Sequence, residues 1–186
     1  MSRIKYIGLL FGLVLVIISF LFFGRRHEMH MALLLGGICV SLFFFLAVLI
    51  GKGTIKSKCQ WTLIVLFAVV LQWQTEPFLI KASYLIYLKS NAVELAEANS
   101  ILEVKTGEIS VINDKIVDKT DQLSEMEISR LIELRKDLDV YLILKSKESI
   151  YYGLWGFLDV RLGVVYWLQD TEPKQALKSL RGNWYY

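Results

Sequence analysis

Two long runs of uncharged, apolar residues near the N-terminus constrain this chain more than any other feature. Residues 6–24 and residues 31–51 contain no charged side chain and are dominated by Ile, Leu, Val and Phe. A helix of 19 residues spans roughly 29 Å, close to the thickness of a bilayer's hydrocarbon core. The first run is longer than the core of a signal peptide and lacks a small-residue cleavage site, so we expect it to be retained. The two runs predict transmembrane helices at about 5–24 and 31–51.

A third apolar run, residues 61–80, is also long enough to cross a membrane. Its second half is interrupted by a polar group, Gln72, Gln74, Thr75 and Glu76. Pro77 follows, and we expect it to break or kink the helix, because proline lacks an amide hydrogen and its ring clashes with the preceding turn. The run predicts a third transmembrane helix at about 61–80, which completes an anchor over residues 1–80.

Composition and charge separate the anchor from the rest of the chain. The sequence is 55% hydrophobic and only 21% charged, with a mean hydropathy of +0.47 in 186 residues, which excludes an ordinary soluble protein. Residues 1–89 hold nine Lys/Arg against two acids, whereas residues 90–186 hold twelve against sixteen. A basic excess beside apolar runs is typical of membrane flanks, so the lipid bilayer is the predicted partner and nucleic acid is not. Two cysteines are too few for a disulfide framework.

The distribution of basic residues predicts which way the chain crosses the membrane. Five of them flank the open end of the first helix pair: Arg3, Lys5, Lys52, Lys56 and Lys58. Only Arg25 and Arg26 lie in the turn at the other end, and the margin narrows if Lys81 and Lys89 are counted with them. On the positive-inside rule the N-terminus is cytoplasmic. A multi-pass protein of the plasma or inner membrane is predicted, with its C-terminal domain outside the cytoplasm.

An amphipathic helix is expected to connect the anchor to this domain over residues 81–103. Its apolar positions recur at spacings of three and four, in a seam formed by Leu85, Leu88, Ala92, Leu95, Asn99 and Leu102. Such a seam with one buried polar residue resembles a short coiled coil, in which the five residues Leu85, Leu88, Leu95, Asn99 and Leu102 would contact a partner chain or a second copy. The alternative is an amphipathic helix that lies on its own domain.

Residues 104–186 are expected to form a small α+β domain. Alternating apolar and polar residues at 102–105, 108–112 and 115–118 surround two turn signals and predict a short meander. Ser124-Glu125-Met126-Glu127 is a capping box, which predicts the start of a helix that continues to about Lys147. A second, short helix is expected from Lys174 to Leu180, and the aromatic tail Trp184-Tyr185-Tyr186 is expected to dock on the domain or at the membrane interface.

The aromatic-rich segment 150–168 admits three interpretations. It is long enough for a fourth transmembrane helix, but Asp159 and Arg161 would then place two unpaired charges in lipid. As strands it would turn Leu158, Val160 and Leu162 inward and both charged residues toward water. As an interfacial segment it would hold its aromatic rings at headgroup depth. The predicted fold class is therefore an integral membrane α-helical protein with three, or at most four, transmembrane helices followed by a small α+β domain.

Chemistry-bearing residues gather only at His27-Glu28-Met29-His30. The zinc-protease pattern needs two histidines four residues apart on one helical face, whereas these two are three apart in a polar turn. No nucleophile elbow or phosphate-binding glycine loop is present, and Gly36 and Gly37 are interpreted as helix-packing sites. We therefore predict no catalytic residues, no cofactor and no metal, and the protein is not expected to be an enzyme.

The sequence favours a non-catalytic membrane protein that presents a domain for self-association or for binding a partner protein. A second hypothesis is an oligomeric pore or membrane-permeabilising effector gated by that domain, with Gln72, Gln74 and Glu76 near the conduction path. A membrane enzyme is a third, resting on His27, Glu28 and His30 alone.

Overall fold

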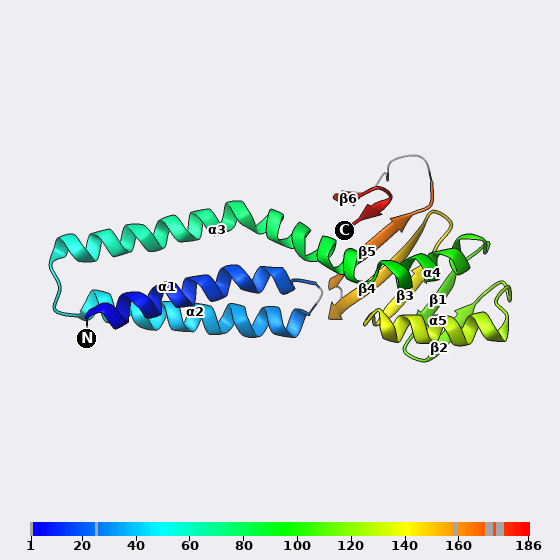
Figure 1. The fold of residues 1–186 in the computed structure, drawn as a ribbon, viewed down its shortest axis with the longest axis horizontal. Coiled ribbons are helices and arrows are strands. Elements are labelled where there is room, and N and C mark those ends of the chain that lie inside the picture. The colour runs from blue at the N-terminus through cyan, green and yellow to red at the C-terminus, as the bar shows by residue number, and fades with distance from the viewer. Residues whose placement is uncertain (1, 25, 158–159, 170–172, 174–176) are drawn as a thin grey trace. The chain divides into compact units, whose positions relative to one another are not determined.

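The chain forms two compact units, residues 1–83 and residues 84–186. The computed structural model describes residues 2–24, 26–157, 160–169, 173 and 177–186. Three long helices come first, and an antiparallel sheet with two further helices follows (Figure 1). The coarse prediction, membrane-type helices and then an α+β domain, is therefore confirmed.

The three apolar runs form helices α1 (Ser2–Ser19), α2 (His27–Ile50) and α3 (Ile55–Ser90), with a short 3-10 turn, η1 (Phe20–Phe22), after α1. Each of the three is long and apolar enough to cross a membrane. They are apolar around their whole circumference, as helices surrounded by lipid require, so most of their large side chains are exposed in the isolated chain.

Helix α3 extends beyond the predicted run at both ends and passes through Pro77 without interruption. Of the predicted break or kink, the break is therefore wrong. A proline inside a helix frees one carbonyl, and membrane helices tolerate it where neighbouring groups bond the backbone. The carbonyl oxygen that Pro77 leaves without its amide donor is that of Trp73, four residues earlier. The connecting helix predicted over 81–103 is divided at Asn91, where α3 ends and α4 (Ala92–Glu103) begins.

A seam of small residues packs α1 against α2, which lie side by side in an antiparallel pair (Figure 1). A methyl group added at Gly37 would lie 2.8 Å from the Gly12 carbonyl oxygen, and one at Gly12 would overlap the Ser41 hydroxyl. These contacts leave no space for a side chain, as in the small-xxx-small packing of membrane helices. Gly37 is therefore a helix-packing site as predicted, whereas Gly36 has nothing within 4 Å of an added methyl and is not.

The adjacent glycines Gly36 and Gly37 give a matched test of the packing between α1 and α2. We expect Gly37→Leu to lower the stability of the protein by about 2 kcal/mol or more, because overpacking a tight contact typically costs 1–3 kcal/mol. Gly36→Leu adds the same volume at an open position and should change stability little. Thermal unfolding of both variants in detergent micelles measures the difference, and equal unfolding temperatures would contradict the packing described here.

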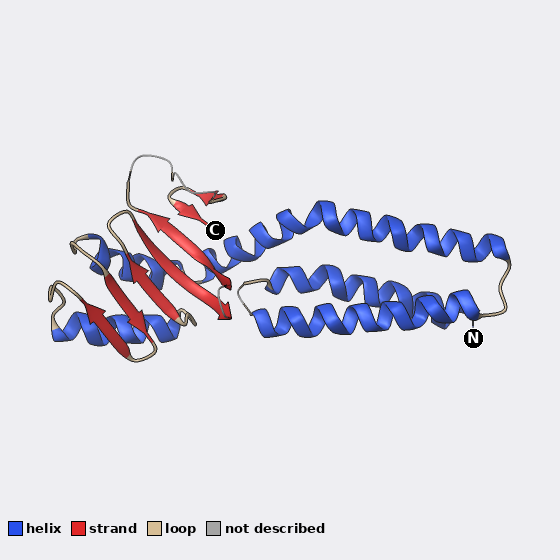
Figure 2. Ribbon diagram, turned by 180° about the vertical axis from the view of Figure 1, so that it is seen from behind, coloured by secondary structure: helices blue, strands red, loops and turns tan. Residues whose placement is uncertain are grey.

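The second unit is a single antiparallel sheet in the order β2-β1-β3-β4-β5-β7-β6. Its strands are β1 (Ile109–Ile112), β2 (Lys115–Asp118), β3 (Leu142–Lys145), β4 (Ser149–Phe157), β5 (Val160–Trp167), β6 (Ser179–Arg181) and β7 (Trp184–Tyr185). Helices α4 and α5 (Glu125–Asp137) cover one face, and Figure 2 views the sheet from the other face.

Two of the predicted meander strands, 108–112 and 115–118, form the β1–β2 hairpin, whereas 102–105 belongs to the end of α4 and the following turn. The predicted capping box is confirmed: the Ser124 hydroxyl accepts from the Glu127 amide, and Glu127 accepts from the Ser124 amide at 2.8 Å. Hydrogen bonds from Lys105 and Ser124 lower the pKa of Glu127 to about 2, so the cap is ionised at neutral pH. The helix ends at Asp137 rather than near Lys147, because the chain turns there into β3.

The segment 150–168 forms the hairpin of β4 and β5, so the strand interpretation is the correct one and a fourth membrane helix is wrong. Arg161 is exposed, as that interpretation requires, while Leu158 and Asp159 lie outside the described residues. The helix predicted over 174–180 is wrong at its C-terminal end, because Ser179 and Leu180 belong to strand β6. Residues 174–176 lie outside the described residues.

The aromatic tail docks on the sheet domain as predicted. Strand β7 is inserted between β5 and β6, and Tyr166 pairs with Trp184 across it. The Trp184 ring also lies 5.8 Å from the Tyr152 ring, between ring centres. The C-terminal residues are therefore part of the sheet rather than a free end.

The core of the sheet domain lies between the two helices and the covered face of the sheet. Val111, Ile143, Tyr152 and Val164 are paired across four strands, and each is at most 1% exposed. The Tyr152 hydroxyl donates to the Asn99 amide oxygen of α4 at 2.6 Å. Arg130 of α5 joins the two helices with a bidentate ion pair to Glu97 of α4, at 2.6 and 2.7 Å.

Candidate binding groove

Three adjoining cavities run along α4 and the strands β5 and β7, and together we call them the Tyr166 groove. Tyr166 lines all three, while Leu88, Ala92 and Trp184 line the two nearer to the end of α3. Their volumes are about 620, 350 and 770 Å³, within the range of ligand sites in proteins. All the lining residues belong to the sheet domain, so the groove is built within one unit.

The groove lies between the end of α3 with α4 on one side and the strands β5 and β7 on the other. Tyr166 and Trp184 face each other across the pair, with ring centres 5.0 Å apart. On the opposite side, α4 presents the short side chains of Ala92, Ala96 and Ser100, together with Leu95, Asn99 and Glu103. The result is a channel with an aromatic wall on one side and a helix on the other.

The five predicted contact residues do not share one environment. Leu95, Asn99 and Leu102 are buried, at 2%, 7% and 0% exposure, under the sheet of their own chain. Leu85 and Leu88 are half-buried and line the groove, and Leu95 and Asn99 form the bottom of its middle cavity. The seam was predicted either to form a coiled coil or to pack on its own domain. In the structure α4 packs on its own domain, because its polar residue Asn99 accepts a hydrogen bond from Tyr152 of the sheet. Only Leu85 and Leu88 have surface left for another molecule.

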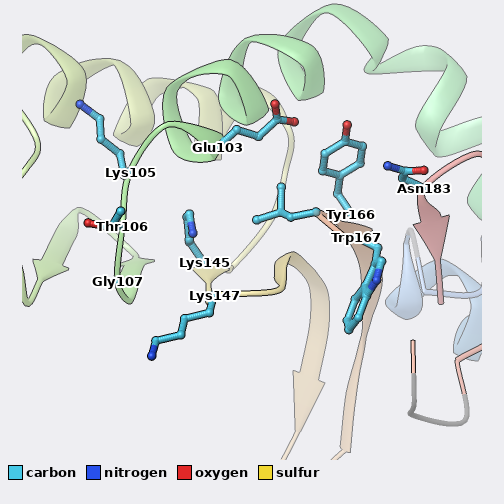
Figure 3. A pocket seen from close by; sticks show the side chains of 10 residues that line it. Glu103, Lys105, Thr106, Gly107, Lys145, Lys147, Tyr166, Trp167 and Asn183 are labelled. Atoms are coloured by element: carbon cyan, nitrogen blue, oxygen red, sulfur yellow. The ribbon is translucent and has the colours of Figure 1, made fainter. Parts of the chain in front are cut away.

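The far end of the groove is a cavity lined by lysines, which we call the lysine cavity (Figure 3). Lys145 and Lys147 come from β3 and the turn after it, Lys105 from the loop after α4, and Glu103 from the end of α4. Lys105 is already paired, with its ammonium 2.6 Å from Glu127 and 3.1 Å from the Gln122 carbonyl oxygen. Lys147 is exposed at the rim.

Lys145 is the most unusual of these residues because it is only 3% exposed. Its pairing with Ile109 and Ile150 places it on the helix-covered face of the sheet. The ammonium donates to the Ser146 carbonyl oxygen at 2.7 Å, and it forms no ion pair with a carboxylate among the residues described. Burial lowers the pKa of Lys145, since a charge removed from water is costly.

Glu103 and Tyr166 form a second electrostatic feature of the cavity, next to each other in Figure 3. Burial raises the pKa of Tyr166, and the charge and hydrogen bonding of Glu103 raise it further. Glu103 is the one acidic side chain among the residues that line the lysine cavity, and it is exposed.

The three polar residues assigned to a pore lie in α3. Gln72 and Glu76 are half-buried and Gln74 is exposed. On a helix, positions 72 and 76 are about 40° apart, whereas position 74 is about 200° from position 72. One face can therefore present Gln72 and Glu76 to a lumen, but not Gln74 with them.

The histidines of the polar turn have a structural contact. His30 is buried, its Nδ1 donates to the Ser19 carbonyl oxygen at 3.0 Å, and its ring meets Phe20 and Phe23 edge-on. No group of three or more metal-ligating side chains occurs in the described part of the chain. His30 thus links the ends of α1 and α2.

The uncovered face of the sheet carries an apolar row. Val117, Leu144, Tyr151 and Val165 follow one another across the strands, with Ser110 between the first two. Val117 is 54% exposed and Leu144 36%. The Tyr141 ring covers Gly153 of β4, and the Tyr151 ring covers Gly163 of β5. The exposed apolar surface of this face is therefore confined to the strands near β2.

Comparison with known protein families, with curated proteins and with solved structures finds no match to this chain. The geometry of the groove is therefore the basis for a functional assignment.

Sequence reasoning missed the residues that define the groove, namely Lys145, Tyr166 and Trp184. The helix predicted to run to Lys147 concealed that Lys145 is on a strand. Lys145 lies two residues after Ile143 on β3, and this alternation could have indicated a lysine at a buried position. Trp184 lies beside Tyr166 because β7 pairs with β5. The order of strands in a sheet cannot be predicted from local sequence patterns.

The burial of Lys145 predicts a specific pH dependence. The pKa of Lys145 in the folded state lies below the ordinary value of 10.5. As the pH rises toward 10.5, the folded state therefore binds fewer protons than the unfolded state. The free energy of unfolding increases over this pH range. Groups that face Lys145 are Glu103 and Tyr166 from α4 and β5, and Lys105 and Lys147 from the adjacent loops. Lys145→Met removes the buried charge.

We expect the Lys145→Met variant to be more stable than the wild type near neutral pH, with a difference that shrinks as the pH approaches 10.5. Thermal unfolding of both proteins between pH 7 and about 10.5 measures it. Lys115→Met, at an exposed position of β2, is the control. A difference that does not vary with pH would show that the Lys145 ammonium is solvated.

Proposed function

We propose that this protein is a non-catalytic, membrane-anchored binding protein whose sheet domain holds an acidic segment of a partner protein in the Tyr166 groove. The observation that carries the proposal is the groove itself, an open channel with an aromatic wall and a cationic end. Tyr and Trp are the residues that most often anchor protein interfaces, because they provide a large apolar surface together with a polar tip.

The charge of the groove near the end of α3 indicates the chemistry of the partner. Lys89 and Arg181 line this end together with Leu85, Leu88 and Ala92. Neither cation forms an ion pair within the described part of the chain. A segment with an aliphatic side chain flanked by Asp or Glu complements this surface, since opposite potentials steer association and fix register.

Site-specific photo-crosslinking in cells tests this proposal. A benzophenone side chain at Ala92 points into the groove, whereas one at the neighbouring Val93, which is 75% exposed, does not line it. We expect a discrete crosslinked protein from position 92 and none from position 93. The charge reversals Lys89→Glu and Arg181→Glu should lower its yield several-fold, because rim charges contribute mainly to the rate of association.

Equal crosslinking from both positions, or a yield unaffected by charge reversal, would contradict an acidic segment in the groove. A product with twice the mass of the chain would instead identify a second copy as the occupant, and the protein would be assigned to self-association.

The orientation of the anchor is part of the same proposal. Five basic residues at the open end of the first helix pair favour a cytoplasmic N-terminus in the plasma or inner membrane. Three crossings then leave the sheet domain, and the partner, outside the cytoplasm. Because 150–168 is a strand hairpin, Ser129 and Ser179 belong to one folded domain and should lie on the same side.

Cysteine accessibility in intact cells measures this orientation. In a background without Cys39 and Cys59, a single cysteine at Ser129 or Ser179 should react with a membrane-impermeant maleimide, and one at Ser2 should react only after permeabilisation. Both serines of the sheet domain are exposed, so burial does not explain a lack of labelling. Protection of both from outside labelling would place the domain in the cytoplasm.

An oligomeric pore stays the alternative prediction, restricted to Gln72 and Glu76 as lining residues, and steady single-channel currents in planar bilayers would favour it. An enzyme based on His27, Glu28 and His30 has no further support, because His30 is occupied by its bond to Ser19.

A further inference from the structure

Lys145 lacks the counter-charge that a buried ammonium needs. Of its three N–H donors, one is used by the Ser146 carbonyl oxygen. Buried charges in proteins are ordinarily paired, because transfer of an unpaired ion from water is costly. The Lys145 side chain lines the lysine cavity, so its remaining donors are available to a molecule that enters there.

The lysine cavity has a net positive charge, which favours an anion. Lys105 is paired with Glu127, and the other charged residues that line the cavity are Glu103, Lys145 and Lys147. Lys145 and Lys147 are then two cations for which the described residues provide no ion-pair partner. A phosphate monoester carries up to two negative charges at neutral pH and offers three acceptor oxygens, which matches two ammonium groups with several free donors.

The shape of the cavity indicates what the phosphate carries. The volume of about 620 Å³ is much larger than an inorganic phosphate needs. The half-buried Tyr166 ring and the side chain of Leu168 line the part opposite the lysines, and the Asn183 amide stands beside them. A planar or apolar group attached to the phosphate can contact these residues while the phosphate reaches Lys145.

We infer that the lysine cavity is a binding site for a small phosphate monoester with an aromatic or apolar group, whose phosphate is bound by Lys145 and Lys147 and whose ring lies against Tyr166. The site differs from the surface proposed for a partner segment, which lies at the Lys89 and Arg181 end of the groove. The two ends meet at Tyr166, so a molecule in the cavity would also change the wall of the partner surface.

Calorimetric titration of the full chain, in nanodiscs of phosphatidylcholine, tests the inference with three probes. Phenyl phosphate supplies both chemical groups, inorganic phosphate supplies only the anion, and phenol supplies only the ring. We expect phenyl phosphate to bind with a dissociation constant in the millimolar range and both fragments to bind more weakly. Lys145→Met should weaken phenyl phosphate about 10-fold or more, as loss of a charge-assisted hydrogen bond does.

Two further variants make the result decisive. Lys147→Glu reverses the charge at an exposed rim position, where folding is not at risk, and should also weaken phenyl phosphate. Lys136→Met, on the outer face of α5, should leave binding unchanged. The inference is overturned if phenyl phosphate does not bind, if it binds no better than phenol, or if Lys147→Glu and Lys145→Met bind it as the wild type does. Partner crosslinking at Ala92 is measured without these probes, so either result can fail alone.

Discussion

The hydroxyl of Tyr152 donates to the amide oxygen of Asn99 in the layer between α4 and the sheet, and the rest of the sheet domain is arranged around this contact. Both groups are buried, and an unsatisfied polar group there would cost about 1–3 kcal/mol. The bond fixes α4 over β4, and the pair of Arg130 with Glu97 then fixes α5 beside α4. The Tyr166 groove lies beside this contact, between α4 with the end of α3 and the strands β5 and β7.

The two units are stabilised by different physical means. In the first, large apolar side chains face outward, and close packing is confined to small residues such as Gly12 and Gly37, because lipid provides no hydrophobic drive between helices. In the second, leucines of α4 and α5 are buried against the sheet, as in water-soluble proteins. A membrane anchor followed by a domain with its own core suits a protein whose binding surface must be held at a membrane.

The two proposed binding sites meet at one aromatic side chain. Tyr166 stands between the cations Lys89 and Arg181 at one end and the buried Lys145 at the other. The first end presents two exposed cations beside leucines, which suits a polypeptide, whereas the second contains the buried Lys145, which suits a small anion. An occupant of either end contacts Tyr166, so the two binding events would be coupled through that residue.

The sequence by itself determined the elements whose cause is local. Uncharged runs of membrane length specified three helices, the capping box at Ser124 specified the start of α5, and period-two alternation favoured strands over a fourth crossing at 150–168. Only the tertiary structure decided that Leu95, Asn99 and Leu102 face their own sheet, that β3 follows α5 so soon, and that Trp184 stands beside Tyr166. A periodic seam has the same spacing whether a partner or the chain itself covers it, and the order of strands depends on hydrogen bonds between residues far apart in the sequence.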